Sequence, residues 1–378
     1  MASFPLLFLP PPVVGHESGL FNPRVVVGGE ALSTAAAAYT TTSNDCRVRV
    51  SVRLELPPAE SYLHMQTDDT LLKDPLVLAA CGDLLLVHMV VHDAADDLSC
   101  KQNLFVYKAH PTRPSLSRLP NPDTFTGWAQ SCGIVPCDDG GFVVASFRTI
   151  KTDLDLQTGL AMERVEFLHY SPATGHWDLK SPTMPYDGEA LKPCLWETDQ
   201  VFSYPDGTIY WVDYHRGLLS CNVLSAGENL ELRFIQLPGI EIWTELDDLS
   251  YGRVYPEAYR TVGVCKGIVK FVDIDNGFFG SMKKSGFTVT VWTLKMPELE
   301  WHQTSMFQVD DLWALANFRE SSLPRWVPQF PIVNTHDNHG LYFILQECDS
   351  FGEDWIITVD MHNKVLQSYE RRIYSILE

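Results

Sequence analysis

Residues 201–211, Val201-Phe-Ser-Tyr-Pro-Asp-Gly207-Thr-Ile-Tyr-Trp211, consist of a short apolar run, a turn that ends in glycine and a second apolar run. This pattern predicts two β-strands joined by a tight turn. It occurs five times, with turn glycines at Gly82, Gly141, Gly207, Gly267 and Gly340. The intervals of 59, 66, 60 and 73 residues match the span of a four-stranded propeller blade with long loops. We expect most of the first four glycines to adopt positive φ, where a Cβ is costly.

A second strand–turn–strand pair follows each of these hairpins. In Glu166–Trp177, for example, a β-rich run, a polar turn and another β-rich run follow one another. The same unit has Gly140-Gly141 followed by Tyr170 and Trp177 at kelch-blade spacing, whereas the other four units do not. We predict an all-β fold, a single β-propeller of four-stranded antiparallel blades that are kelch-like in build. A β-sandwich with long loops is the alternative, because short strands at similar intervals occur in both folds.

Five units leave the N-terminal part of the chain to be placed. Residues 47–56, Arg47-Val-Arg-Val-Ser-Val-Arg-Leu-Glu-Leu56, alternate charged and apolar residues as a half-buried strand does. With Arg24–Val27, this strand would supply a sixth blade or complete the last one, because a propeller closes its sheet edges. We expect six blades, with five or seven as alternatives. Since no linker interrupts residues 50–375, we assign residues 1–46 to an irregular segment with a possible closing strand and 47–378 to one propeller domain.

The charge balance restricts the partners. A formal net charge of −20, from 48 acidic and 28 basic residues, repels phosphate backbones, so we expect no nucleic-acid partner. A net negative charge of this size keeps a protein soluble. If it also serves binding, the partner that it favours is a protein with a basic surface. No window reaches the apolar length of a membrane span, and the apolar stretch Phe4–Pro12 lacks a basic start and contains helix-breaking prolines. We expect no membrane partner and a cytoplasmic or nuclear location.

Metal and cofactor signatures are weak in this chain. The nine cysteines include no C-x-x-C pair. Cys81, Cys137 and Cys265 lie at a similar point of three different units, near the end of the strand before the turn glycine, which indicates a repeated position for a small apolar side chain. The cluster His336-Asp-Asn-His339 is a solvated turn or a weak cation site. There is no G-x-S-x-G, Walker loop or G-x-G-x-x-G. We predict no catalytic residue, no metal and no cofactor.

One segment, Tyr210–Gly217, gathers chemically capable side chains. It places aromatics, an acid, an imidazole and a guanidinium within eight residues. Period 2 along a strand puts Trp211, Asp213 and His215 on one face. An Asp213–His215 pair could orient an imidazole for acid–base work. A buried Asp–Arg or Asp–His pair that satisfies polar groups of the blade is the reading we favour. The candidate binding residues are Trp211, Asp213, His215 and Arg216.

The same residues carry a family resemblance. The matching stretches are Arg53–Pro58, Val77–Val87, Gly133–Val144, His169–Trp177, Tyr210–Cys221 and Phe234–Pro238. Together they resemble the plant domain-of-unknown-function 1618 family, which is expanded in grasses, over residues 47–375. The most specific part is Tyr210-Trp-Val-Asp-Tyr running into Gly217 and Cys221. Asn222 stands where the family pattern would have Asp, which argues against an essential acid there.

The resemblance implies a fold and an origin and no activity. The family is similar to the propellers attached to plant F-box proteins, although no F-box helices are recognised before residue 47. It implies a propeller and a plant intracellular origin. We infer a non-catalytic protein-interaction propeller. The alternative is an enzyme that acts on a small plant metabolite at the mouth of the propeller channel with Asp213, His215 and Arg216.

Overall fold

The structure is a computed structural model of the chain. It describes residues 7–8, 20–27, 37–53, 60–68, 72–92, 100–121, 131–154, 161–180, 182, 196–204, 206–224, 230–240, 242, 256–275, 286–335, 337–346 and 354–372. Most of the apolar stretch from residue 4 to residue 12, and His336, lie outside these residues. The described strands form one sheet of nine strands and four sheets of four strands.

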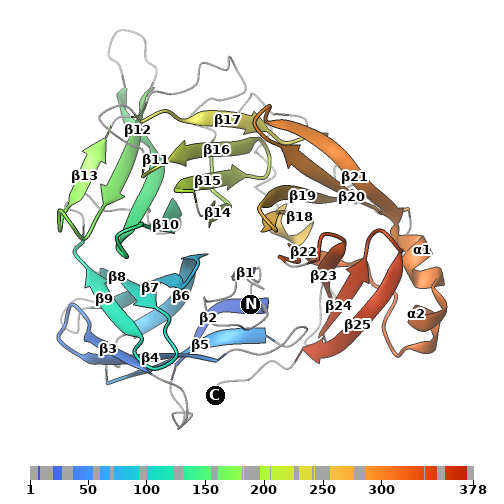
Figure 1. Cartoon of the computed structure of the whole chain (residues 1–378), viewed down its shortest axis with the longest axis horizontal. Coiled ribbons are helices and arrows are strands. Elements are labelled where there is room, and N and C mark those ends of the chain that lie inside the picture. The colour runs from blue at the N-terminus through green and yellow to red at the C-terminus, as the bar shows by residue number, and fades with distance from the viewer. Residues whose placement is uncertain are drawn as a thin grey trace.

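Six blades are arranged in a ring around a common centre (Figure 1). The nine-stranded sheet comprises blades 1 and 2, joined by the single pair Arg24–Leu76, and the short strand β1, Leu7–Phe8. From the centre outward, blade 1 consists of β2 (Leu20–Val27), β5 (Glu60–Thr67), β4 (Arg47–Arg53) and β3 (Ala38–Thr41), and blade 2 of β6 (Leu72–Cys81), β7 (Leu84–His92), β8 (Cys100–Lys108) and β9 (Ser115–Leu119). Blade 3 consists of β10 (Cys132–Pro136), β11 (Phe142–Leu154), β12 (Ala161–Tyr170) and β13 (Trp177–Lys180). Blade 4 consists of β14 (Gln200–Ser203), β15 (Thr208–Asp213), β16 (Gly217–Asn222) and β17 (Arg233–Gln236). Blade 5 consists of β18 (Arg260–Cys265), β19 (Ile268–Asp275), β20 (Thr288–Lys295) and β21 (Glu300–Gln308), and blade 6 of β22 (Gln329–Val333), β23 (Gly340–Leu345), β24 (Asp354–Asp360) and β25 (Val365–Arg372).

The predicted six-bladed all-β propeller is confirmed, and the sandwich alternative is wrong. Blades 2 to 6 are antiparallel throughout, but blade 1 departs from the prediction because β2 pairs with β5 in parallel. Strands β2 and β3 come from residues 1–46, the segment expected to be irregular with a possible closing strand. Residues 20–67 therefore form the sixth blade. Of the two possibilities for Arg24–Val27 and residues 47–56, a separate blade or completion of the last one, the first is observed.

Both faces of a blade are buried against neighbouring blades. Along β15, Ile209 and Trp211 join the cluster that contains Phe147 of blade 3. The alternating residues Tyr210 and Val212 join the cluster that contains Phe271 of blade 5. Since successive side chains of a strand point to opposite faces, burial on both faces requires apolar residues at nearly every position. This packing explains the continuous apolar runs that mark each unit in the sequence.

The inner turns have the backbone geometry that the sequence predicted. Gly82, Gly207 and Gly267 have φ of 59°, 92° and 76°. In blade 3 the positive φ, 81°, belongs to Gly140 and not to Gly141. The expectation that most of these glycines adopt positive φ is confirmed, and in blade 3 the strained position lies one residue earlier than expected.

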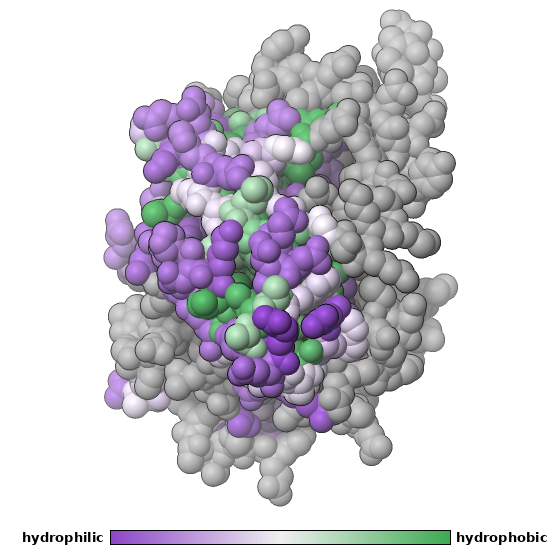
Figure 2. All heavy atoms as spheres, turned by 90° about the vertical axis from the view of Figure 1, so that its right-hand side faces the viewer, coloured by the Kyte–Doolittle hydropathy of each residue, from purple (hydrophilic) through white to green (hydrophobic). Residues whose placement is uncertain are grey.

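Two short helices, α1 (Val309–Ala314) and α2 (Ala316–Glu320), lie between β21 and β22 on the outside of the ring (Figure 1). Val309, Leu312 and Phe318 anchor them in the core shared by blades 5 and 6. Figure 2 shows mostly hydrophilic side chains on this side of the molecule, with small apolar areas between them. In the described part of the chain, no helix has both the length and the apolar character needed to cross a membrane.

Candidate functional site

The segment with the candidate residues forms the connection between β15 and β16. Strand β15 ends at Asp213, and the Arg216 amide donates to the Asp213 carbonyl oxygen at 2.9 Å, which closes a turn before Gly217 begins β16. His215 therefore lies in a turn and not on a strand. The predicted alternation of side chains along a strand applies to Trp211 and Asp213, which both belong to β15. It does not apply to His215, because the strand ends at Asp213.

Trp211 is a core residue that joins two blades. Its side chain is 0% exposed, and its indole Nε1 donates to the Ser131 carbonyl oxygen at 2.7 Å. The rings of Phe147 and Phe167 lie against it, with centroids at 6.1 Å and 5.7 Å. A buried indole with its single donor satisfied by a neighbouring blade stabilises the fold and presents no surface to a ligand.

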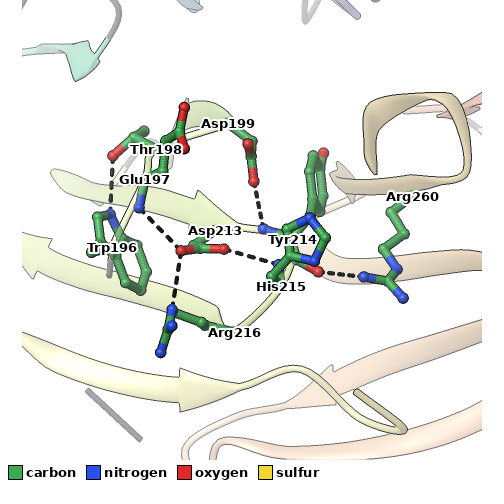
Figure 3. Close-up of polar contacts among 9 residues, drawn as sticks. All are labelled: Trp196, Glu197, Thr198, Asp199, Asp213, Tyr214, His215, Arg216 and Arg260. Atoms are coloured by element: carbon green, nitrogen blue, oxygen red, sulfur yellow. Dashed lines mark hydrogen bonds and ion pairs between the residues drawn. The ribbon is translucent and has the colours of Figure 1, made fainter. Parts of the chain in front are cut away.

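Asp213 is fully buried and bonded to its own loop (Figure 3). Its Oδ2 accepts a hydrogen bond from the Glu197 amide at 3.1 Å and lies 3.6 Å from Arg216 Nε. Its Oδ1 accepts from the His215 amide at 2.9 Å. The Arg216 side chain is also buried, at 4% exposure. A buried carboxylate that accepts two amides and faces a buried guanidinium is a structural group, since its polar atoms are satisfied inside the fold.

The imidazole of His215 takes no visible part in a dyad with Asp213. In Figure 3 the ring points away from that carboxylate, and the hydrogen bond from His215 to Asp213 is donated by the His215 main-chain amide. Asp213 thus positions the backbone of the turn. The orientation needed for a carboxylate to align an imidazole for proton transfer is not the one observed.

Residues that sequence reasoning missed fasten this turn to blade 5. The Tyr214 amide donates to Asp199 Oδ2 at 2.7 Å, and the Tyr214 carbonyl oxygen accepts from Arg260 Nη1 at 2.7 Å (Figure 3). Arg260 is itself paired with Asp273, with Nε and Oδ1 2.8 Å apart. No short-range signal in the sequence connects Arg260 with Tyr214, because the contact depends on the packing of one blade on the next.

A hollow of about 310 Å³ lies elsewhere, between the outer parts of blades 4 and 5. Its lining includes Tyr210, Asn222, Arg233, Met296 and Leu299, and it includes none of the four candidate residues. Among the residues that the structure describes, no group of three or more His, Cys, Asp or Glu side chains could hold a metal ion. Of the segment Tyr210–Gly217, Tyr210 lines this hollow, and Trp211, Asp213, His215 and Arg216 do not.

The turns between the first and second strands of blades 2 to 6 meet on one side of the ring, which we call the turn face (residues 82–83, 138–140, 206–207, 266–267 and 337–339). Hydrogen bonds reach some of these turns from the neighbouring blade: Lys108 Nζ, at the end of β8, donates to the Gly140 carbonyl oxygen at 3.0 Å, and Tyr204 Oη of blade 4 donates to that of Gly267 at 2.7 Å. The Lys266 amide donates to the Thr335 carbonyl oxygen of blade 6 at 3.1 Å. These bonds join blade 2 to blade 3, blade 4 to blade 5, and blade 5 to blade 6.

Carboxylates from four blades lie on the turn face. Asp138, Asp139 and Asp206 are exposed, and Asp83 and Asp337 are half-buried. The exposed cation Lys266 comes from blade 5. No local sequence pattern brings these acids together, because they come from different blades.

Several of these carboxylates also shape their turns. Asp139 Oδ1 and Asp206 Oδ1 each accept the amide of the residue two positions later, at 2.8 Å in both cases. Burial raises the pKa of the nearby Cys81 thiol to about 12, and Asp83 and Asp206 add to this rise. The charges of Asp83 in blade 2 and Asp206 in blade 4 therefore both act on the Cys81 thiol, beside the turn face.

The fold and these surfaces define a six-bladed β-propeller with a turn face on one side of the ring. Residues 211–342 match the sequence model of a family described as "Protein of unknown function (DUF1618)". The match begins at Trp211 and supports, over these residues, the family resemblance that the sequence indicated. No curated protein matches the chain.

Solved structures resemble the chain only remotely. They include a putative TolB from Agrobacterium tumefaciens, with 10% identity, a TM-score of 0.34 and 79% of each chain covered. A mutant NanB sialidase from Streptococcus pneumoniae has 8% identity and a TM-score of 0.33, covering 84% of this chain and 53% of that one. The family 117 glycoside hydrolase Zg3597 from Zobellia galactanivorans has 10% identity and a TM-score of 0.31, covering 82% of this chain and 84% of that one. Likenesses this distant carry no argument about function.

Proposed function

We propose that this chain is a non-catalytic propeller that binds another protein through its turn face. The observation that carries the proposal is the gathering of carboxylates from four blades, those of blades 3 and 4 exposed, on a surface of short turns that hydrogen bonds from neighbouring blades help to hold. Because such turns are already ordered, a partner loses little free energy in fixing them. The sign of the charge favours a partner with a basic surface, since complementary charge speeds association and selects the partner.

The alternative is an enzyme acting on a small plant metabolite at the channel mouth with Asp213, His215 and Arg216. Two observations weigh against it. The Asp213 carboxylate and the Arg216 guanidinium are buried and lie 3.6 Å from each other. The hollow of about 310 Å³ is lined by other residues. A group that is to act on a substrate has to reach it, so these side chains suit a structural role better.

The proposed setting is the cytoplasm or nucleus of a plant cell, with kelch-like blades serving as the interaction scaffold. In the described part of the chain, Cys81, Cys137, Cys221 and Cys265 are free thiols. Free thiols persist in reducing compartments, which supports this setting.

The test removes charge from the turn face without altering its turns. In the variant Asp138→Asn/Asp139→Asn/Asp206→Asn, the amide oxygens still accept from Gly141 and Thr208, so the melting temperature should stay close to that of the parent. After partners are isolated from plant extract, we expect the association rate of the main partner to fall about ten-fold at low salt. High salt should reduce this difference, because it screens exposed charges.

A matched control removes three charges from another surface. The variant Asp310→Asn/Asp311→Asn/Glu320→Gln changes exposed carboxylates of α1 and α2. It should bind as the parent does. The proposal fails if the turn-face variant associates at the parent rate, or if the control variant loses as much as the turn-face variant.

A further inference from the structure

Blade 6 places two histidines side by side on neighbouring turns. His339 belongs to the turn between β22 and β23, and His362 to the turn between β24 and β25. Their ring centroids are 4.8 Å apart, and their planes are inclined by 38°. Both residues are exposed. Sequence analysis singled out only His339, within the cluster that begins at His336, because His362 lies more than twenty positions further along the chain.

The backbone under both imidazoles is fixed by hydrogen bonds. The His339 amide donates to Asp337 Oδ1 and the His362 amide to Asp360 Oδ1, each at 2.9 Å. The Met361 amide donates to the His339 carbonyl oxygen at 2.8 Å, which joins one turn directly to the other. The two rings therefore start from anchored positions, and bringing them onto a common ligand costs little conformational entropy.

The spacing of the rings suits a shared metal ion. With metal–nitrogen bonds of about 2.0–2.1 Å, two imidazoles on one ion have ring centres about 5 Å apart. Imidazole nitrogen is a preferred donor for zinc, copper and nickel. We propose that His339 and His362 form a binding site for a divalent transition-metal ion such as Zn²⁺, with water completing the coordination. This site stands apart from the proposed protein-binding function, and either can hold without the other.

Two carboxylates beside the rings add a favourable potential. Asp337 and Asp360 each hold one of the turns, and both oxygens of Asp360 accept hydrogen bonds from Asn363, at 2.9 Å from its main-chain amide and 2.8 Å from Nδ2. Asp360 is thus occupied as a structural acceptor and acts on the cation through its charge.

Calorimetric titration of the full chain with Zn²⁺ tests the site. We expect one ion per chain in the strongest binding step, and His339→Gln and His362→Gln should each weaken that step about ten-fold or more, because each removes one of two ligands. His302→Gln is the matched control: it changes a single exposed histidine on β21 and should leave binding within about two-fold of the parent. Unchanged melting temperatures of the variants without metal would show that the turns are intact.

A second measurement locates the ion. Crystals soaked in Zn²⁺ should give an anomalous peak at the zinc edge between the rings of His339 and His362. The proposal is overturned if both glutamine variants bind Zn²⁺ as the parent does, or if the strongest anomalous peak lies at other residues.

Discussion

Replacing Asp213 with Ala is expected to lower the free energy of unfolding by about 3–5 kcal/mol, because it leaves the buried Arg216 guanidinium without its carboxylate. Two amides, those of Glu197 and His215, lose their acceptor in the same change. Asp213→Asn keeps one amide oxygen and removes the charge, so we expect a smaller loss of about 1–3 kcal/mol. Chemical denaturation followed by tryptophan fluorescence measures both values.

Asp138→Asn is the control for Asp213. It makes the same chemical change on an exposed turn, where substitutions are usually within about 0.5 kcal/mol of neutral. If Asp213→Asn were as stable as the parent and yet lost turnover of a metabolite, the structural role would be wrong and the enzyme alternative would gain the residue that it needs.

Gly207→Val is expected to lower the free energy of unfolding by about 2–6 kcal/mol, through backbone strain of about 1–3 kcal/mol and overpacking of similar size. Gly207 has a φ of 92°, and a Cβ there would lie 2.6 Å from Leu224 Cγ and 2.9 Å from its Cβ. The Leu224 Cβ is tied to the main chain, so a change of rotamer does not relieve the contact. Thermal denaturation followed by circular dichroism should show a clear fall in melting temperature.

Alanine at Gly207 and Gly82 separates strain from collision. Gly82 also has a positive φ, 59°, but an added Cβ there meets nothing within 4 Å. Gly82→Ala should therefore cost only the conformational penalty, about 1–2 kcal/mol. Gly207→Ala should cost more, and the excess should shrink when Leu224 is also replaced by Ala. Equal losses at the two glycines would contradict the collision with Leu224.

The fold was predictable because each blade repeats the same local signals. Short apolar runs around a glycine turn reflect strands that are buried on both faces, as Trp211 and Val212 are on opposite sides of β15. The parallel pairing of β2 with β5 was not predictable, because it joins residues 20–27 to residues 60–67, with β3 and β4 between them in the chain. Such a pairing depends on how the ring of blades closes, and ring closure leaves no signal in the local sequence.

The candidate site was predictable only in part. Alternation along a strand correctly gave Trp211 and Asp213 a common face, but the end of β15 at Asp213 removes His215 from that pattern. Two partners of this segment come from other blades, Ser131 for Trp211 and Arg260 for Tyr214. The pairing of His339 with His362 was missed for the same reason, since it depends on how two hairpins of one blade lie together.

The four strands of each blade follow one another in the sequence. The first blade spans residues 20–67 and the last spans residues 329–372. Within the described chain, no strand of the last blade pairs into the first. Duplication or loss of one stretch in the gene would thus add or remove a whole sheet and never divide one. Because contacts between repeated units are mostly with nearest neighbours, a new unit needs only two matching flanks. The architecture is therefore free to evolve in steps of one blade.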